Sequence, residues 1–175
     1  NELANSLPST GAHIFTYEVA NPSEYGVLEI DNLNTPISIT EKPKEFISNL
    51  AVTGLYFFDS KVSAFAKAVK PSKRGELEIT DAIQGLVNVG MLVGVSEVSG
   101  WWFDTGNPDS FLECNARVLD SGSQGERQFS SDVRIIEPCA ISASAVLKNC
   151  TIGPYSSIGP GARVSGINIS NSVLL

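Results

Sequence analysis

The 175-residue sequence is poor in cysteine, histidine and basic charge, and it lacks any long apolar run. Its three cysteines, Cys114, Cys139 and Cys150, are odd in number and show no C-x-x-C spacing. This argues against a zinc site or a disulfide framework and favours a reducing, cytoplasmic setting. No stretch of about 18 apolar residues occurs, so no membrane-spanning helix is expected.

The charge composition argues against nucleic acids and membranes as partners. The chain has 12 basic and 19 acidic side chains, a net charge of −7, and no cluster of Lys and Arg. A nucleic-acid-binding surface needs such a cluster to displace counterions, so we expect neither a nucleic acid nor a membrane as partner. With 42% hydrophobic and 18% charged residues, the composition is that of a globular protein.

The two ends of the sequence predict a longer protein. It begins Asn1-Glu2-Leu3, without methionine or a basic-then-apolar leader, and it ends at Val173-Leu174-Leu175, an apolar stretch with no turn after it. We interpret both ends as truncation points within a longer protein. The length fits one domain with part of a second.

Residues 1–119 show the patterns of a mixed α/β domain. The run Leu50–Phe58 is almost continuously apolar, which is typical of a strand buried on both faces. Thr80 or Asp81 is a candidate helix cap, and Asn107 before Pro108 is another. The predicted strands are 12–19, 25–30, 35–40, 50–58 and 91–98, with a hairpin turn at 31–34; the predicted helices are 61–70, one ending at 89, and one from 108 to 119.

The pattern changes after residues 120–132, which lack periodicity and are predicted to be a linker. In residues 133–175, branched aliphatic residues recur five or six positions apart, with small and turn residues between them: Ile141, Leu147, Ile152, Ile158 and Val164. Neither a helix nor an ordinary strand has this period. It predicts a triangular parallel β-helix of about two coils, with the aliphatic side chains inside.

Side chains able to carry chemistry gather in four segments, mostly at the ends of predicted strands or in loops. In Tyr25-Gly26-Val27, the glycine either lets a ligand approach the backbone or tolerates a strand twist. In Glu41-Lys42-Pro43, Lys42 suits a phosphate and Glu41 suits sugar hydroxyls, although a solvated surface pair is the simpler interpretation.

The other two segments surround the predicted second helix and the last strand. Residues 71–81 place basic residues, including Arg74, with a glycine and carboxylates at a helix entrance, which suits a phosphate; capping carboxylates are the alternative. Residues 100–106 place Asp104 just past an aromatic strand, where it is positioned either to hold Mg²⁺ or to close an Asx turn.

Four strings, in this order, resemble the carboxyl half of the catalytic domain of the long-form glucose-1-phosphate thymidylyltransferases, within the sugar-1-phosphate nucleotidylyltransferase family. They are NPSEYGVLEID, ITEKPKEFISNLAVTGLYFFD, KPSKRGELEITDAIQ and GWWFDTGNPDSFLECNARVLD. The resemblance covers residues 12–119 almost continuously. It implies part of a Rossmann-like α/β domain (1–119), then a linker (120–132) and a truncated left-handed parallel β-helix (133–175).

The resemblance also implies a reaction, in which glucose 1-phosphate and a nucleoside triphosphate give a nucleotide sugar and pyrophosphate. The family likeness implies dTTP as the nucleotide and dTDP-glucose as the product. In this reaction, Lys42 and Arg74 hold the sugar phosphate, and Asp104 is one of two Mg²⁺-binding aspartates. The intact protein is expected to form a homo-oligomer. The implied glucose-site residues are Gly26, Glu41 and Val52, with Tyr25 and Trp102 as walls of the site.

Important parts of the family pattern are missing from the sequence. The glycine-rich nucleotide loop, with its Arg and Lys, and the other magnesium aspartate are not present, so we expect this chain to be inactive by itself.

Two alternatives therefore stay open. One is a hexapeptide-repeat sugar acyltransferase or a bifunctional enzyme, although His13 is the only histidine and precedes the repeats. The other is a regulatory paralogue that binds sugar nucleotides without turnover.

Overall fold

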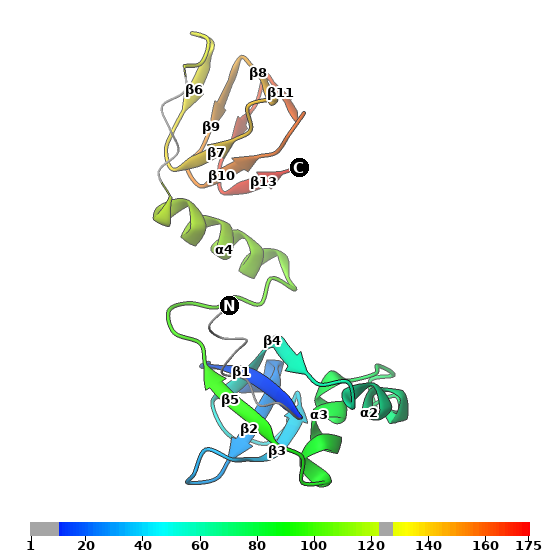
Figure 1. The fold of residues 1–175 in the computed structure, drawn as a ribbon. Coiled ribbons are helices and arrows are strands. Elements are labelled where there is room, and N and C mark those ends of the chain that lie inside the picture. Colours follow the sequence, from blue (N-terminus) through cyan, green and yellow to red (C-terminus); the bar gives the residue numbers. More distant parts are fainter. Residues whose placement is uncertain (1–10, 123–127) are drawn as a thin grey trace. The chain divides into compact units, whose positions relative to one another are not determined.

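The structure, a computed structural model, describes residues 11–122 and 128–175. It divides into two compact units, Asn1–Trp102 and Phe103–Leu175 (Figure 1). Part of the predicted linker, residues 123–127, lies outside the described residues. The helix that follows Asn107 belongs to the second unit, whereas the predicted domain boundary at 119 places it in the first. The domain boundaries stay a prediction.

The first unit is built on one mixed five-stranded sheet with the order β3-β2-β4-β1-β5. Strands β1 and β5 run parallel, and the other neighbouring pairs are antiparallel. The predicted hairpin is present, because Asp31 accepts backbone hydrogen bonds from Leu33 and Thr35 and closes the turn. The strands are β1 (Ala12–Glu18), β2 (Gly26–Ile30), β3 (Pro36–Glu41), β4 (Leu50–Phe58) and β5 (Val93–Glu97).

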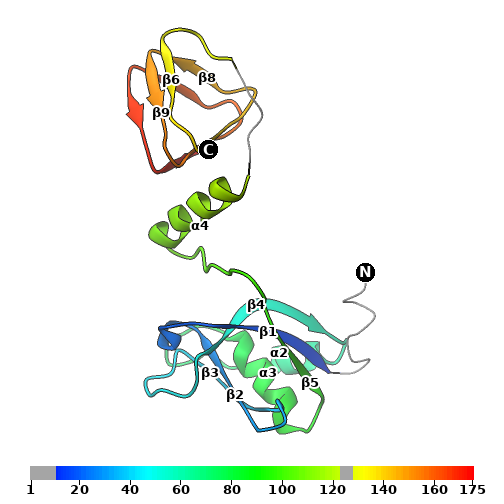
Figure 2. The same ribbon diagram turned by 90° about the vertical axis from the view of Figure 1, so that its left-hand side faces the viewer.

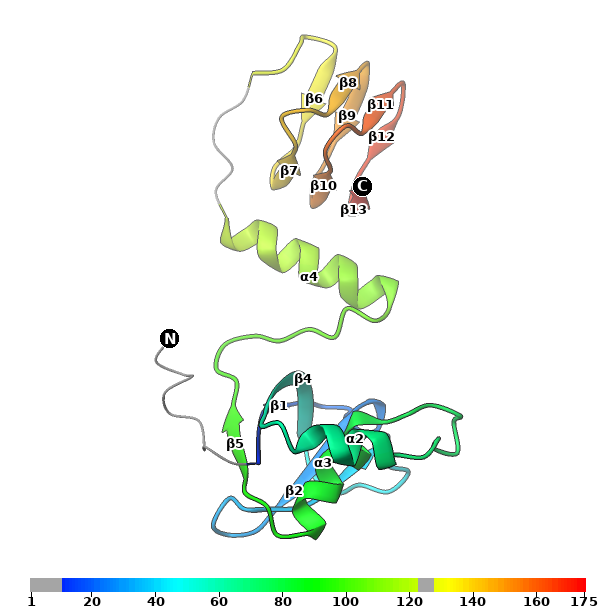
Figure 3. The same cartoon turned by 45° about the vertical axis from the view of Figure 1, so that its right-hand side comes forward.

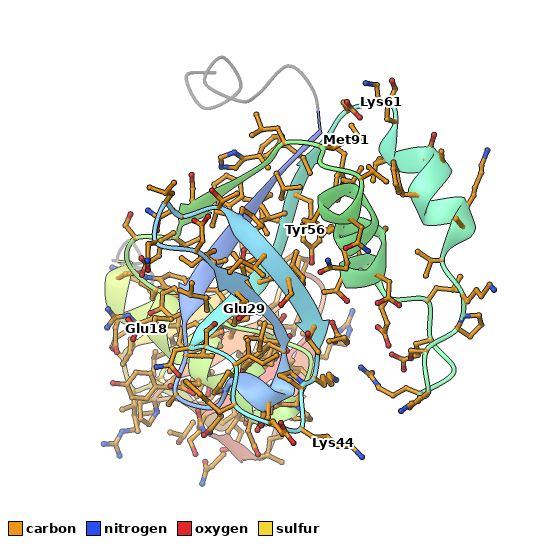
Figure 4. The ribbon with its side chains drawn as sticks, turned by 90° about the horizontal axis from the view of Figure 1, so that it is seen from below. Glu18, Glu29, Lys44, Tyr56, Lys61 and Met91 are labelled. Carbon is orange, nitrogen blue, oxygen red and sulfur yellow. The ribbon has the colours of Figure 1, made fainter. Side chains whose placement is uncertain are left out.

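Two helices pack on one face of this sheet (Figure 2). They are α2 (Val62–Ala68) and α3 (Ile79–Asn88), and a short 3-10 helix η1 (Pro22–Glu24) precedes β2. Side chains alternate along each strand, so one set faces the helices and forms the core. The buried core residues are Ala12, Ile14, Leu28, Ile39, Val52, Ile83, Leu86 and Val93. Tyr56 of β4 lies between the sheet and α3 (Figure 4).

Two sequence expectations for this unit are wrong. Strand β4 is not buried on both faces along its length, since Leu55 and Phe57 are 51% and 38% exposed. They lie on the face away from α2 and α3, which no helix of the described first unit covers. Helix α3 begins after Glu78, and no side chain caps it, so Thr80 and Asp81 are inside its first turn instead of at its cap.

The second unit contains a parallel β-helix, as the spacing of aliphatic residues predicts. Its short strands form three parallel sheets, β13-β10-β7, β11-β8 and β12-β9-β6, whose strands lie beside one another coil by coil (Figure 3). Cys139 pairs with Ser156 and Val146 pairs with Arg163, 17 residues apart, and Ser156 pairs with Ser172, 16 residues apart, so one coil takes 16 or 17 residues. The strands are β6 (Val133–Ile135), β7 (Cys139–Ile141), β8 (Val146–Lys148), β9 (Cys150–Ile152), β10 (Ser156–Ile158), β11 (Arg163–Ser165), β12 (Asn168–Ile169) and β13 (Ser172–Leu174).

The predicted aliphatic residues face the interior of this β-helix. Ile152, Ile158 and Val164 are buried, and Ile141 and Leu147 pack against them. Helix α4 (Pro108–Ser121) belongs to the same unit and starts as predicted, because the Asn107 side chain accepts a hydrogen bond from the Ser110 backbone. Among the described residues, no helix is long and apolar enough to cross a membrane.

Candidate functional site

The open end of the β2–β3 hairpin brings together four residues singled out from the sequence. Gly26 pairs with Glu41 across the two strands. One residue further on, the Lys42 backbone N–H donates to the Tyr25 carbonyl at 2.9 Å. Lys42 has a positive φ of 43°, a conformation that non-glycine residues adopt rarely and often at functional sites. Its exposed ammonium group forms no ion pair with any described residue.

Glu41 extends from this hairpin toward the first turn of α3. The buried Thr80 hydroxyl donates to Glu41 Oε2 at 3.2 Å. Gly26 makes room for both groups, because a Cβ at that position would lie 2.7 Å from the Thr80 methyl group and 3.1 Å from Glu41 Oε2. Val52 lies 4.0 Å from the same point and is buried. Gly26, Glu41 and Val52 are therefore neighbours on the helix-covered face of the sheet.

Arg74 reaches Glu41 from the loop between α2 and α3. Its Nη1 atom lies 3.4 Å from Glu41 Oε1 and 3.7 Å from Glu78 Oε1, and its Nη2 atom pairs with Glu76. Glu78 is 9% exposed and also accepts a hydrogen bond from the Ser72 hydroxyl at 2.8 Å. In this structure the guanidinium predicted to bind phosphate is thus held by three carboxylates.

Tyr25 and Trp102, the predicted walls of the sugar site, contact each other edge to face at 5.4 Å between ring centroids. The Trp102 indole N–H donates to the Thr53 carbonyl, and its ring lies 6.0 Å from that of Tyr17. Tyr25 precedes Gly26 in an extended conformation, so its side chain points to the opposite face of the hairpin. The structure therefore places the aromatic pair and the Glu41 group on different faces of the sheet.

Asp104 belongs to the second compact unit, so its convergence with Lys42 and Arg74 stays a prediction. Its Oδ1 atom accepts the Gly106 backbone N–H at 3.1 Å, which is the Asx turn that the sequence left open. The residues that the structure describes contain no group of three His, Cys, Asp or Glu side chains placed to hold a metal ion. One exposed carboxylate does not make a magnesium site, so the described residues do not fit Mg²⁺ without further ligands.

The cluster around Glu41 and Arg74 contains further residues. The sequence predicts another role for these residues or does not single them out. Thr80, expected as a helix cap, binds Glu41 instead, because α3 starts too early for Thr80 to be a cap. Tyr56 faces the same region; burial, and secondly the negative charge of Glu41, raise the pKa of its hydroxyl. Glu78 was visible in the sequence only as one of several carboxylates near a helix start.

Known proteins resemble this chain in both sequence and structure. The nucleotidyltransferase Agl11 of low-salt glycan biosynthesis in Haloferax volcanii is 37% identical over 94% of the chain and 52% of its own length. A glucose-1-phosphate thymidylyltransferase of Streptomyces antibioticus is 34% identical over 94% of the chain and 51% of its length. The chain thus spans about half the length of these curated relatives.

A solved structure also resembles this chain. A crystal structure from Bacillus anthracis, provisionally assigned as a glucose-1-phosphate thymidylyltransferase in complex with sucrose, is 42% identical. It superimposes with a TM-score of 0.59 and covers 71% of this chain and 49% of that one. The sequence model of the nucleotidyl transferase family matches residues 3–121, more than half of the chain. The chain therefore belongs to the nucleotidyl transferase family.

Proposed function

We propose that the intact protein transfers a nucleotidyl group from a nucleoside triphosphate, dTTP being the first candidate, to glucose 1-phosphate. A phosphate oxygen of the sugar phosphate attacks the α-phosphorus, the bond between the α- and β-phosphates breaks, and pyrophosphate leaves. The products are dTDP-glucose and pyrophosphate. The relatives named glucose-1-phosphate thymidylyltransferase support this reaction.

The observation that carries the proposal is the position of Glu41. This partly buried carboxylate is oriented by Thr80 and Arg74 and lies beside Gly26, which has no side chain to block its approach. A fixed carboxylate accepts hydrogen bonds from sugar hydroxyls well. We assign the hexose to Gly26, Glu41 and Val52 and its phosphate to the unpaired Lys42 and to Arg74.

Tyr25, Trp102 and Asp104 have less support as site residues. The two aromatic rings lie on the other face of the sheet, so they are retained only as walls at the strand ends. Asp104 is retained as one ligand of a Mg²⁺ ion whose other ligands lie outside the described residues. When bound, the ion would offset the negative charge of the triphosphate.

The setting of the intact protein is part of the proposal. We propose a homo-oligomer, as the resemblance implies, and a cytoplasmic location, which is supported by three free cysteines. The β-helix is assigned a structural role, because acyl transfer on such repeats usually needs a histidine base and the only histidine, His13, lies on β1.

Binding of glucose 1-phosphate to the 175-residue chain, measured by titration calorimetry, tests the assignment. Glu41→Gln is expected to weaken binding roughly tenfold or more, because it removes a charged hydrogen-bond acceptor. Glu97→Gln is the charge-matched control, because Glu97 is exposed on β5, at the edge of the same sheet opposite β3. Equal affinities of the wild type and Glu41→Gln, or no binding by the wild type, would contradict the proposed function.

A further inference from the structure

The guanidinium group of Arg74 has two edges, and their carboxylate partners differ in burial. Its Nη1 atom lies between Glu41 from β3 and Glu78 at the start of α3. Glu78 is 9% exposed and bound by Ser72, and Glu41 is 22% exposed and bound by Thr80. Because both carboxylates are partly or wholly buried and have a second donor, neither can leave the guanidinium without losing other hydrogen bonds.

The Nη2 edge has a partner of a different kind. It pairs with Glu76, whose side chain is 60% exposed, and among the described residues this carboxylate accepts no other hydrogen bond. Ion pairs this exposed contribute little to stability, because water screens the charges and holding two flexible side chains together costs entropy. Glu76 is therefore the partner of Arg74 that solvent or a ligand most easily replaces.

The backbone of the loop keeps Glu76 close to Arg74 even when the side chains separate. The Ser72 N–H donates to the Glu76 carbonyl at 2.8 Å, and the Gly75 N–H donates to the Ser72 carbonyl at 2.9 Å. Gly75 has a φ of +81°, which closes this turn. Only the Glu76 side chain, and not its backbone, needs to move for the Nη2 edge to open.

We propose that Glu76 is an internal competitor for the phosphate group on Arg74, and that a dianionic phosphate ester binds by displacing it. This inference rests on the proposed function, because the phosphate ester is the one assigned to Lys42 and Arg74. Arginine binds phosphate through two parallel hydrogen bonds, which needs the edge that Glu76 occupies. A phosphate dianion displaces the Glu76 carboxylate from Arg74 more readily than the single carboxylate of a ligand does. Glu76 therefore selects phosphate esters over carboxylated sugars.

The proposal predicts a gain of affinity from removing a charged residue. A ligand binds only to those molecules in which Glu76 has left the Nη2 edge, so its apparent affinity falls with the fraction of open molecules. Removing the Glu76 charge raises that fraction and tightens binding. Glu76→Gln is expected to tighten binding of glucose 1-phosphate roughly two- to fivefold. Because Glu76 is exposed, the variant should fold, and thermal unfolding followed by circular dichroism verifies this.

A double-mutant cycle separates competition from a general loss of negative charge. The gain from Glu76→Gln should disappear in an Arg74→Gln background, whereas a long-range charge effect would persist there. Glu97→Gln, which changes the net charge by the same amount on the opposite edge of the sheet, should leave affinity unchanged. No gain, or an equal gain in the absence of Arg74, would overturn the proposal.

Inorganic phosphate as a second probe distinguishes the two proposals. If wild-type chain fails to bind glucose 1-phosphate but inorganic phosphate shows the Arg74-dependent gain, the proposed function fails and the competition stands. If glucose 1-phosphate binds and Glu76→Gln brings no gain, the function stands and the competition fails. If neither probe binds to any variant, both are wrong.

Discussion

At the residue scale, three aspartate side chains accept hydrogen bonds from backbone N–H groups and so fix the local backbone. Asp59 accepts the backbone N–H groups of Gly11 and Lys61. Asp31 accepts those of Thr35 and Leu33. Asp132 accepts the Ser130 hydroxyl and the Asn149 backbone N–H. These hydrogen bonds stabilise the ionised form and lower the pKa of each carboxyl group, the Gly11 contact being the largest cause for Asp59.

The lowered pKa of Asp59 predicts acid-sensitive stability. A carboxyl group whose pKa is lower in the folded state stabilises the fold above its unfolded pKa of about 3.9 and loses that effect as the pH falls through the folded pKa. Asp59→Asn is therefore expected to lower the thermal midpoint at pH 7. The difference from wild type should shrink below about pH 4. Calorimetric scans between pH 7 and pH 2 check this, and a difference that is constant with pH would contradict it.

The sequence predicted part of the candidate site at this scale. The pairing of Tyr25-Gly26 with Glu41-Lys42 follows from a hairpin whose turn residues are local. The three carboxylates around Arg74 did not follow from the sequence, because Glu41 and Arg74 are 33 residues apart and meet only through the packing of α3 on β3. Which acidic residue faces a guanidinium depends on side-chain direction, and spacing in a loop does not determine that direction.

At the element scale, α3 positions the site and also protects the sheet. Its first turn supplies Thr80 to Glu41, and one turn later Gln84 accepts the Ile39 backbone N–H at 2.7 Å. Strand β3 is at the edge of the sheet, and this contact occupies one of its free N–H groups. The sequence predicted a helix ending near Val89 from its candidate cap residues, but it did not predict the hydrogen bonds of that helix to β3.

The β-helix offers a matched test of core packing. Ile152 is fully buried in its interior, and Ile167, between β11 and β12, is 52% exposed. Ile152→Ala is expected to lower the free energy of unfolding by about 2–5 kcal/mol, because it removes buried methyl groups and leaves a cavity. Ile167→Ala should change it by no more than about 0.5 kcal/mol. Denaturant unfolding measures both; equal effects would contradict the interior position of Ile152.

At the scale of the whole molecule, the chain spans about half the length of the relatives named above. Phosphoryl-type transfer depends on positioning and on neutralising charge from several directions. The described residues supply the Glu41–Arg74 cluster, which we propose binds the sugar phosphate, together with Lys42, which forms no ion pair with them, and no complete metal site. Those groups do not suffice to position a nucleoside triphosphate.

We therefore expect the 175-residue chain to release no pyrophosphate from dTTP in the presence of glucose 1-phosphate and Mg²⁺. A coupled assay with inorganic pyrophosphatase measures the release against a reaction without protein. The same chain carrying Lys42→Met controls for a contaminating enzyme, because contamination would give equal rates in both samples. Turnover that needs Lys42 would show that this chain contains a complete active site.

The sequence by itself determined the five strands of the sheet, the α4 cap and the inward aliphatic residues of the β-helix, since periodicity and turn chemistry act between residues near in sequence. Its four chemical segments also led to the correct family. Only the tertiary structure decided that Thr80 binds Glu41, that Glu41 reaches Arg74, and that Tyr25 contacts Trp102. Those contacts depend on strand register and helix packing, which bring together residues that no local pattern relates.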